Sequence, residues 1–177
     1  MTTSEYLGTP ETVLPRELAY GVLHVAESPS PAHQRVVRDL TIALTLYTRQ
    51  KGLGEVLPAP MDVILDYDAA LVVQPDVIFV GTDRLDIVTD RVHGAPDLAI
   101  EVLSPNSRVG SLDERLQWFA RSGVRECWLC DLPHREIAVL TLSAGGVEVR
   151  AAFRGGDTVV SGVLGDVPLS ADSLYGY

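Results

Sequence analysis

Residues 96–105 of the chain read PDLAIEVLSP, and this stretch decides how the rest of the sequence is interpreted. Asp97 to Ser104 is a nearly continuous apolar run, as expected for a central strand that is covered on both faces. Glu101 interrupts the run, and an ionised carboxylate in a core is costly unless it is paired or binds a metal. The stretch therefore predicts a buried strand that carries either a functional or a firmly paired acid.

A second acid interrupts another apolar run, because residues 71–80 read LVVQPDVIFV and include Asp76. We expect this run to be a strand next to the first. Asp97 and Glu101 share one face of their strand, but four positions separate them by roughly 13 Å, so one ion could not bind both unless the strand bends. Asp76 could instead join Glu101. Two carboxylates, the backbone carbonyl of Val102 and water make a typical Mg²⁺ or Mn²⁺ site, which can polarise a phosphodiester.

A purely structural alternative explains the same two acids. Asp76 follows Pro75, and could therefore lie in a turn-like bulge rather than in a metal pocket. Glu101 could pair with a buried arginine. The residues alone leave both interpretations open.

Around these two runs the sequence alternates between helical and strand patterns. Residues 31–51 are the clearest helix, with apolar side chains recurring every three or four positions and glycines at the end. We further expect helices over residues 3–7 and 111–122, and strands over 61–66, 71–80, 97–104 and 126–131. Residues 18–27 should form a strand or a hairpin arm, and residues 136–142 should form a hairpin with 147–153. This order predicts a single mixed α/β domain over 1–177, with an N-terminal helix and strands (1–30), a core (31–131) and a β-rich tail (132–177).

Composition and charge restrict the partners of the protein. The 177 residues are 46% hydrophobic, contain no signal-peptide pattern and no run of about 18 apolar residues, and include two cysteines inside an apolar run, so we expect a cytoplasmic protein. The formal net charge of −10 counts against tight non-specific DNA binding. Arg35, Arg38 and Arg49 form a small basic stripe on the long helix that would offset this charge locally, although such a stripe is usually only a solvated face.

A Pro-Asp on one strand followed by an acid on the next resembles the PD-(D/E)XK nuclease superfamily. More narrowly, the chain resembles the Uma-two family of bacterial proteins. The matching segments include PREL, PAHQ, GLGE, VQPD, PDLAIEVLSP and a GVxExWLxD pattern, at residues 15–18, 31–34, 52–55, 73–76, 96–105 and 123–131. This resemblance implies a restriction-endonuclease-like fold, in which helices flank a mixed central sheet, here with a β-rich C-terminal hairpin extension. It also implies a DNA endonuclease that uses Mg²⁺ or Mn²⁺.

The resemblance assigns roles to individual residues. Asp76 would be the motif aspartate and Glu101 the motif glutamate, and both would bind the metal together with the carbonyl of Val102. Glu17 would be the acid that precedes the first helix. His33, in the first turn of that helix, matches the family and would support the site.

The chain departs from the family at the position of its pocket lysine. The general motif has a lysine where this chain has Leu103, and the Uma-two pattern takes an aspartate, a lysine and an aromatic residue from the next helix. Ser111, Arg115 and Phe119 occupy those places here. Arg115 could offset charge on a phosphate but cannot act as a general base, because it stays protonated. Ser111 would lie on the same helical stripe as Arg115.

Two functions from different classes follow. The first is a metal-dependent DNA endonuclease in which Asp76 and Glu101 bind the ion, Asp97 and Glu17 support it or supply a second ion, and Arg115 steadies the phosphate. The second is a catalytically impaired nuclease-fold protein that acts as a homo-oligomeric or regulatory binding module. By analogy with the fold we expect a homodimer, with the tail from Glu136 onward as a contact surface. A metal hydrolase for small phosphorylated substrates is a third possibility, but no motif supports it.

Overall fold

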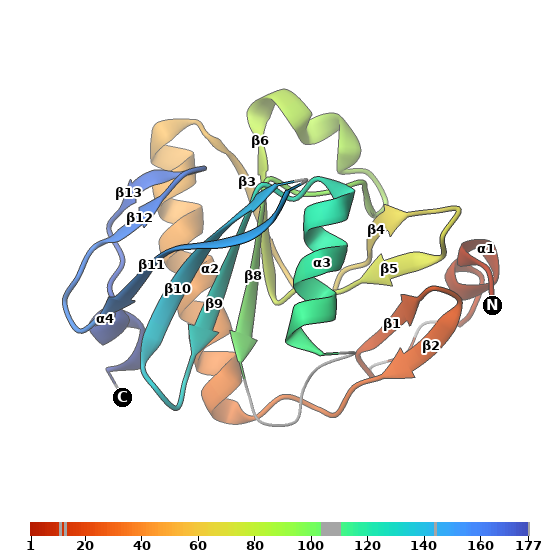
Figure 1. The fold of residues 1–177 in the computed structure, drawn as a ribbon, viewed down its shortest axis with the longest axis horizontal. Coiled ribbons are helices and arrows are strands. Elements are labelled where there is room, and N and C mark those ends of the chain that lie inside the picture. Colours follow the sequence, from red (N-terminus) through yellow and green to blue (C-terminus); the bar gives the residue numbers. More distant parts are fainter. Residues whose placement is uncertain (11, 13, 104–110, 144, 177) are drawn as a thin grey trace.

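The computed structural model describes residues 1–10, 12, 14–103, 111–143 and 145–176 (Figure 1). Its centre is a six-stranded sheet in which β8 and β9 run parallel and all other neighbours are antiparallel. The strand order is β11 (Gly146–Arg154), β10 (Glu136–Ser143), β9 (Glu126–Asp131), β8 (Leu98–Leu103), β6 (Val77–Gly81) and β3 (Gly54–Pro58). The expected mixed central sheet is therefore present, and the expected C-terminal hairpin extends it as β10 and β11.

A second sheet of five strands lies beside the first. Its order is β2 (Val22–Val25), β1 (Arg16–Ala19), β5 (Leu71–Val73), β4 (Val63–Asp66) and β7 (Val92–His93). A short helix, α1 (Thr3–Leu7), lies against this sheet through Tyr6, which is buried with Leu18 and Ile64. The remaining short elements are the 3₁₀ helix η1 (Thr82–Ile87) and the strand pair β12 (Val159–Ser161) and β13 (Gly165–Val167).

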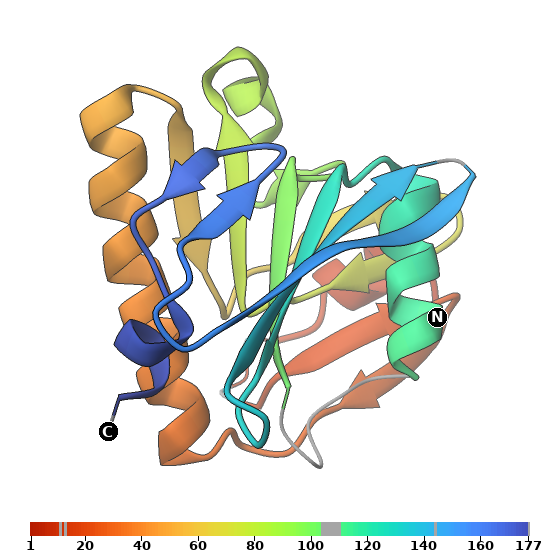
Figure 2. The ribbon, with the colours of Figure 1, turned by 60° about the vertical axis from the view of Figure 1, so that its left-hand side comes forward.

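Two long helices cover opposite faces of the six-stranded sheet (Figures 1 and 2). The first, α2 (Pro31–Lys51), packs on one face together with the C-terminal helix α4 (Ala171–Tyr175). The second, α3 (Leu112–Ser122), packs on the other face and also contacts β4 of the five-stranded sheet. Ser30 caps α2 by accepting the N–H of His33. Among the helices of the described residues, none has the length and apolar character needed to span a bilayer.

The structure corrects the expectation that residues 71–80 form one strand. The run breaks at residues 74–76, so that β5 belongs to the five-stranded sheet and β6 to the six-stranded sheet. Pro75 explains the break, because it has no N–H to donate to a sheet and restricts the residue before it. Asp76 therefore lies in the link between the two sheets and not in the middle of a strand.

Other expected elements differ in detail. The strand or hairpin arm expected over residues 18–27 belongs to the hairpin of β1 and β2, which turns at Tyr20 and Gly21, both with positive φ. The elements β3, β7, β12, β13 and α4 were not predicted, since each is short and its pattern is weak. Ser104 and Pro105, at the end of the motif stretch, lie outside the described residues.

The C-terminal segment is attached to the central sheet through one buried acid. The carboxylate of Glu126, which is 2% exposed, accepts hydrogen bonds from Trp128 Nε1 at 2.8 Å, from Ser161 Oγ at 2.5 Å and from the Gly162 N–H at 2.6 Å. Three donors compensate the charge of this carboxylate where water cannot. These hydrogen bonds give Glu126, the glutamate of the GVxExWLxD pattern, a structural role.

We expect Ser161→Ala to destabilise the fold by about 1–3 kcal/mol, because it leaves the buried carboxylate of Glu126 without one of its donors. Chemical denaturation measures this loss. Val160→Ala, an exposed position on the same strand, is the matched control and should change the free energy of unfolding by much less. Equal effects of the two substitutions would contradict the role given to Glu126.

Candidate metal and phosphodiester site

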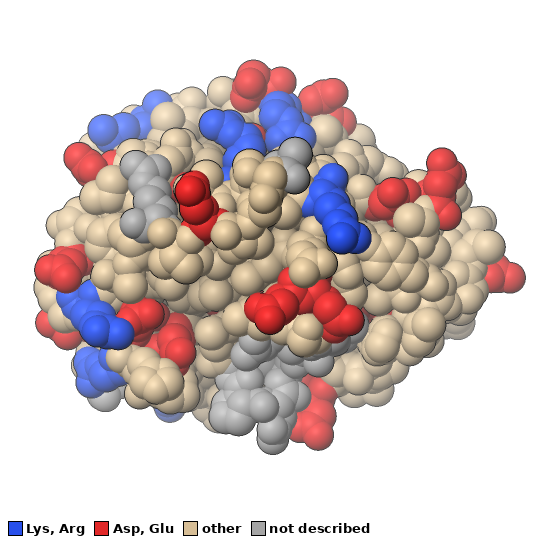
Figure 3. Space-filling model, in the orientation of Figure 1, with Lys and Arg blue, Asp and Glu red and all other residues tan. Residues whose placement is uncertain are grey.

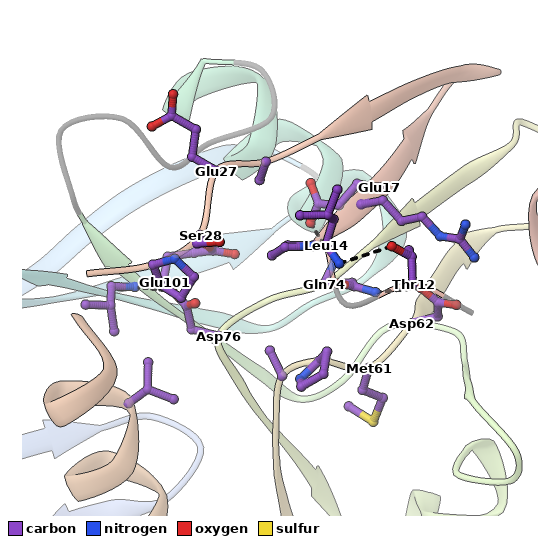
Figure 4. Close-up of a pocket in the computed structure, with 18 of the residues that line it drawn as sticks. Thr12, Leu14, Glu17, Glu27, Ser28, Met61, Asp62, Gln74, Asp76 and Glu101 are labelled. Atoms are coloured by element: carbon purple, nitrogen blue, oxygen red, sulfur yellow. Dashed lines mark hydrogen bonds between the residues drawn. The ribbon is translucent and has the colours of Figure 1, made fainter. Parts of the chain in front are cut away.

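A cavity of about 830 Å³ lies where the two sheets meet beside the first turns of α2 (Figure 4). It is lined by residues from β1, α2, the links before β4 and β6, the end of β8, and α3. Asp76 and Glu101 lie together on one side of it, and Asp62 lies on the opposite side. The site residues expected from the sequence that line this cavity are Glu17, His33, Asp76, Glu101, Val102 and Arg115.

Asp76 and Glu101 are brought side by side by the pairing of β6 with β8. Val77 pairs with Ile100 in this antiparallel register, so the residue before Val77 lies opposite the residue after Ile100. The carboxylate of Asp76 accepts the N–H of Val102 at 2.7 Å through Oδ2. In an extended strand the N–H and C=O of one residue point to the same side, so the carbonyl of Val102 also points toward Asp76.

Arg115 forms the central ion bridge of the site. Its Nε donates to Glu101 Oε1 at 2.7 Å, and its two terminal nitrogens donate to the two carboxylate oxygens of Glu17 at 2.7 and 2.8 Å. All three side chains are less than a tenth exposed. The sequence predicted that Arg115 reaches the pocket. However, its guanidinium is directed at two glutamates, and the structural alternative of a buried arginine paired with Glu101 is observed.

Two titratable groups in the cavity have shifted pKa values. Burial raises the pKa of Glu101 to about 7; the ion pair with Arg115 opposes this shift, whereas the charges of Asp76 and Glu17 reinforce it. Burial lowers the pKa of His33, but its contact with Asp76, 3.2 Å from His33 Nε2 to Asp76 Oδ1, outweighs burial, and the pKa of His33 is raised. Negative charge in the cavity thus exceeds what its cations compensate.

The donor set fits a hard divalent cation, although the described residues contain no group of three or more His, Cys, Asp or Glu side chains placed to hold one. When Glu101 is ionised and His33 is neutral, Glu17, Asp76 and Glu101 bring three negative charges, and Arg115 brings one positive charge between two of them. Each carboxylate has about four acceptor positions, so the hydrogen bonds to Asp76 and Glu101 leave lone pairs for an ion. Mg²⁺ and Mn²⁺ accept two carboxylates, a carbonyl and water.

The structure places two expected residues away from the cavity. Asp97 lies at the other end of β8, where its carboxylate accepts hydrogen bonds from the Gly81 N–H, Arg84 and Arg125 at 2.9 to 3.2 Å. Burial raises the pKa of Asp97, but these hydrogen bonds outweigh it and the pKa is lowered. Ser111 is the N-cap of α3 and bonds to Glu114. Neither residue lines the cavity, so neither supports the Asp76 and Glu101 pair directly.

A polar network on the other side of the cavity was not predicted from the sequence. Asp62 Oδ1 accepts hydrogen bonds from the hydroxyl of Tyr6 at 2.9 Å and from Gln74 Nε2 at 3.0 Å, and Asp62 Oδ2 lies 3.4 Å from Arg91 Nε. The Gln74 N–H also donates to Glu17 Oε1 at 2.6 Å. The position of Gln74 directly before Pro75 in the VQPD segment was the available signal.

Charged side chains of both signs lie on the face of the molecule shown in Figure 3. Acidic and basic side chains of the described residues are interspersed there, and they form no basic patch that spans the face. The arginines of the predicted stripe on α2, at positions 35, 38 and 49, are exposed. Arg38 pairs with the neighbouring Asp39 at 2.7 Å, which reduces its contribution to a phosphate-binding surface.

Comparisons with known proteins identify a family and a fold for this chain. The family model Uma2, described as "Putative restriction endonuclease", matches residues 4–170. The crystal structure of a protein from Anabaena variabilis ATCC 29413, titled "a putative nuclease belonging to DUF820", superposes with a TM-score of 0.82 at 18% sequence identity, covering 99% of this chain and 98% of that one. This likeness shows that the two proteins share the restriction-endonuclease-like fold. A search of curated proteins found no match.

The raised pKa of Glu101 predicts a pH dependence of stability. A carboxyl group whose pKa rises on folding stabilises the folded state most below its ordinary pKa of 4.5, and this contribution is lost as the pH rises through about 7. The melting temperature of the wild type should therefore fall relative to that of Glu101→Gln as the pH rises from about 5 to about 8. Thermal unfolding across this range tests it; parallel curves for the two proteins would contradict the assignment.

Proposed function

Because the chain belongs to the Uma2 family, we propose that the protein is a metal-dependent DNA endonuclease that hydrolyses phosphodiester bonds in the cavity between its two sheets. One observation carries the proposal: Asp76, directly before β6, and Glu101, on the adjacent strand β8, face a cavity whose negative charge is only partly compensated. Mg²⁺ or Mn²⁺ is the expected cofactor, since the site offers hard oxygen ligands.

In this proposal some residues of the cavity bind the ion and others orient its ligands. Asp76, Glu101 and the carbonyl of Val102 would hold the ion. When bound, the ion would supply positive charge to the phosphate under attack and make a nearby water easier to deprotonate. The Val102 N–H and His33 fix the orientation of Asp76 through their hydrogen bonds, so that its carboxylate is preorganised.

The contacts of Arg115 support a different role from the one that the sequence suggested. Three of its five N–H groups donate to the buried carboxylates of Glu17 and Glu101, so these two glutamates, and not a substrate phosphate, set the orientation of the guanidinium. We therefore propose that Arg115 is a positioning residue that fixes Glu101, and that it competes with the metal for Glu101. In this proposal Glu17 holds Arg115 in place instead of binding a second metal ion.

A second candidate is supported by the same ion bridge. If Arg115 compensates Glu101 so well that no ion binds, the protein would be a nuclease-fold binding module without catalysis. Leu103 favours this candidate too, because it occupies the place of the motif lysine and cannot stabilise charge. Metal affinity separates the two candidates.

We expect Asp76→Asn combined with Glu101→Gln to abolish metal-dependent nicking of supercoiled plasmid and to remove Mn²⁺ binding measured by calorimetry, because both proposed ligands lose their charge. Glu148→Gln combined with Asp157→Asn is the matched control, since it changes the net charge equally at exposed positions outside the cavity. Wild-type protein that neither binds Mn²⁺ nor nicks DNA would overturn the endonuclease proposal and favour the binding module.

We expect Arg115→Lys to lower the melting temperature and at the same time to tighten Mn²⁺ binding. A single ammonium cannot span Glu17 and Glu101, so the buried bridge weakens while Glu101 becomes more available to the ion. Calorimetry and thermal unfolding measure the two effects. Arg121→Lys, at an exposed position of the same helix, should change neither quantity. If Arg115→Lys weakened Mn²⁺ binding instead, Arg115 would not compete with the metal.

A further inference from the structure

One end of the five-stranded sheet carries an unusual share of exposed apolar side chains. Of the twelve large apolar side chains that are exposed among the described residues, six gather at this end. We call this surface the hairpin face; it consists of Met1, Tyr20, Val22, Leu23, Val25 and Tyr67. Hydrogen bonds hold its parts together, because the Met1 amino group donates to the Gly21 carbonyl and Thr3 Oγ1 donates to the Tyr67 carbonyl.

The strand β2 is the outer strand of its sheet, so one side of its backbone has no neighbour in that sheet (Figure 1). The two-residue turn makes Ala19 and Val22 the closing hydrogen-bonded pair, and the Ala26 N–H donates to the Pro15 carbonyl at 2.8 Å in the same alternation. The backbone groups of Leu23 and Val25 therefore point outward. Within the described residues, neither takes part in a backbone hydrogen bond outside the hairpin.

Apart from its shortness, this edge lacks the features that usually prevent strands from pairing between molecules. Natural edge strands are protected by shortness, lysine, proline, a bulge or an inward-facing charge. The four residues of β2 read VLHV, and the pairing of β1 with β2 has no bulge. Val22, Leu23 and Val25 are between 43% and 58% exposed, and Leu23 and Val25 share the face opposite to Val22. An added strand would thus cover apolar side chains on both faces.

We propose that β2 is the joint of a homodimer, in which the β2 strands of two copies pair antiparallel about a two-fold axis and join the two five-stranded sheets into one. A strand edge is complementary to itself in this arrangement, because residue i bonds to residue j and j bonds to i. Pairing Leu23 with Val25 of the second copy satisfies the outward N–H and C=O groups of both residues. The two-fold axis then passes next to His24.

Charge favours a second copy over a charged partner as the occupant of this face. Each chain carries a net charge of −10, so two copies repel unless they meet at a neutral surface. Residues 22–25 contain no Asp, Glu, Lys or Arg, whereas a basic partner would gain nothing from binding here. Added salt should therefore tighten the dimer by screening the repulsion between the rest of the two chains.

The joint differs from the tail that the sequence analysis considered as a contact surface. The tail presents β11 as the outer strand of the six-stranded sheet, with Val149 70% exposed. It thus offers a rival edge within the same molecule. Ala26 and the three residues after it line the cavity and directly follow β2. The two cavities of a dimer would therefore both lie close to the proposed joint. The proposal does not depend on catalysis, and it holds for either candidate function.

Sedimentation velocity of the full-length protein over a concentration series tests the joint. We expect the wild type to form dimers, and Leu23→Lys combined with Val25→Lys to raise the dimer dissociation constant by ~10-fold or more, because two buried lysines would face the same pair in the other copy. Val149→Lys is the matched control on the rival edge and should remain dimeric. Circular dichroism confirms that each variant is folded.

Amide hydrogen exchange provides a second measurement that does not rely on substitutions. The Leu23 and Val25 amides should become protected as the concentration of the wild type rises, whereas the Val22 and His24 amides, which already bond to β1, should not change. A wild type that stays monomeric, a double lysine variant that still dimerises, or loss of dimers in Val149→Lys alone would each overturn the proposal.

Discussion

The structure depends on the compensation of buried charge around Arg115. Its guanidinium lies between Glu17 of β1 and Glu101 of β8, and so links the five-stranded sheet to the six-stranded sheet through α3. Removing one partner would leave an uncompensated charge in the interior, which costs far more than an exposed ion pair provides. The same bridge that holds the two sheets together therefore also determines how Glu101 is presented to the cavity.

The Pro75-Asp76 dipeptide is the second constraint. Proline ends β5, and the chain passes from one sheet to the other before β6 begins. As a consequence, Asp76 lies at the junction of the sheets, where the Val102 N–H and His33 hold its carboxylate. A carboxylate in this position is fixed by its surroundings and still faces solvent on the cavity side, which suits an ion ligand better than a residue inside a sheet would.

The sequence predicted the order of the main elements, because long apolar runs depend on local residues, and it named six of the residues that line the cavity. The periodicity of residues 31–51 and the acids at 76 and 101 were sufficient for this. Contacts between distant segments could not be predicted in the same way. Arg115 pairs with Glu17, and Asp97 pairs with Arg84 and Arg125 away from the cavity. Both outcomes depend on which side chains meet after folding. Strand alternation could not name the partners of Asp97, which lies directly before β8.

The central claim is that Asp76 and Glu101 together hold one divalent cation despite the competition from Arg115. A crystal soaked with Mn²⁺ and measured at the manganese absorption edge tests this claim most directly. We predict one anomalous peak within coordination distance of both carboxylates and of the Val102 carbonyl. A map without a peak there, in a crystal that shows Arg115 still bound to Glu101, would contradict the account.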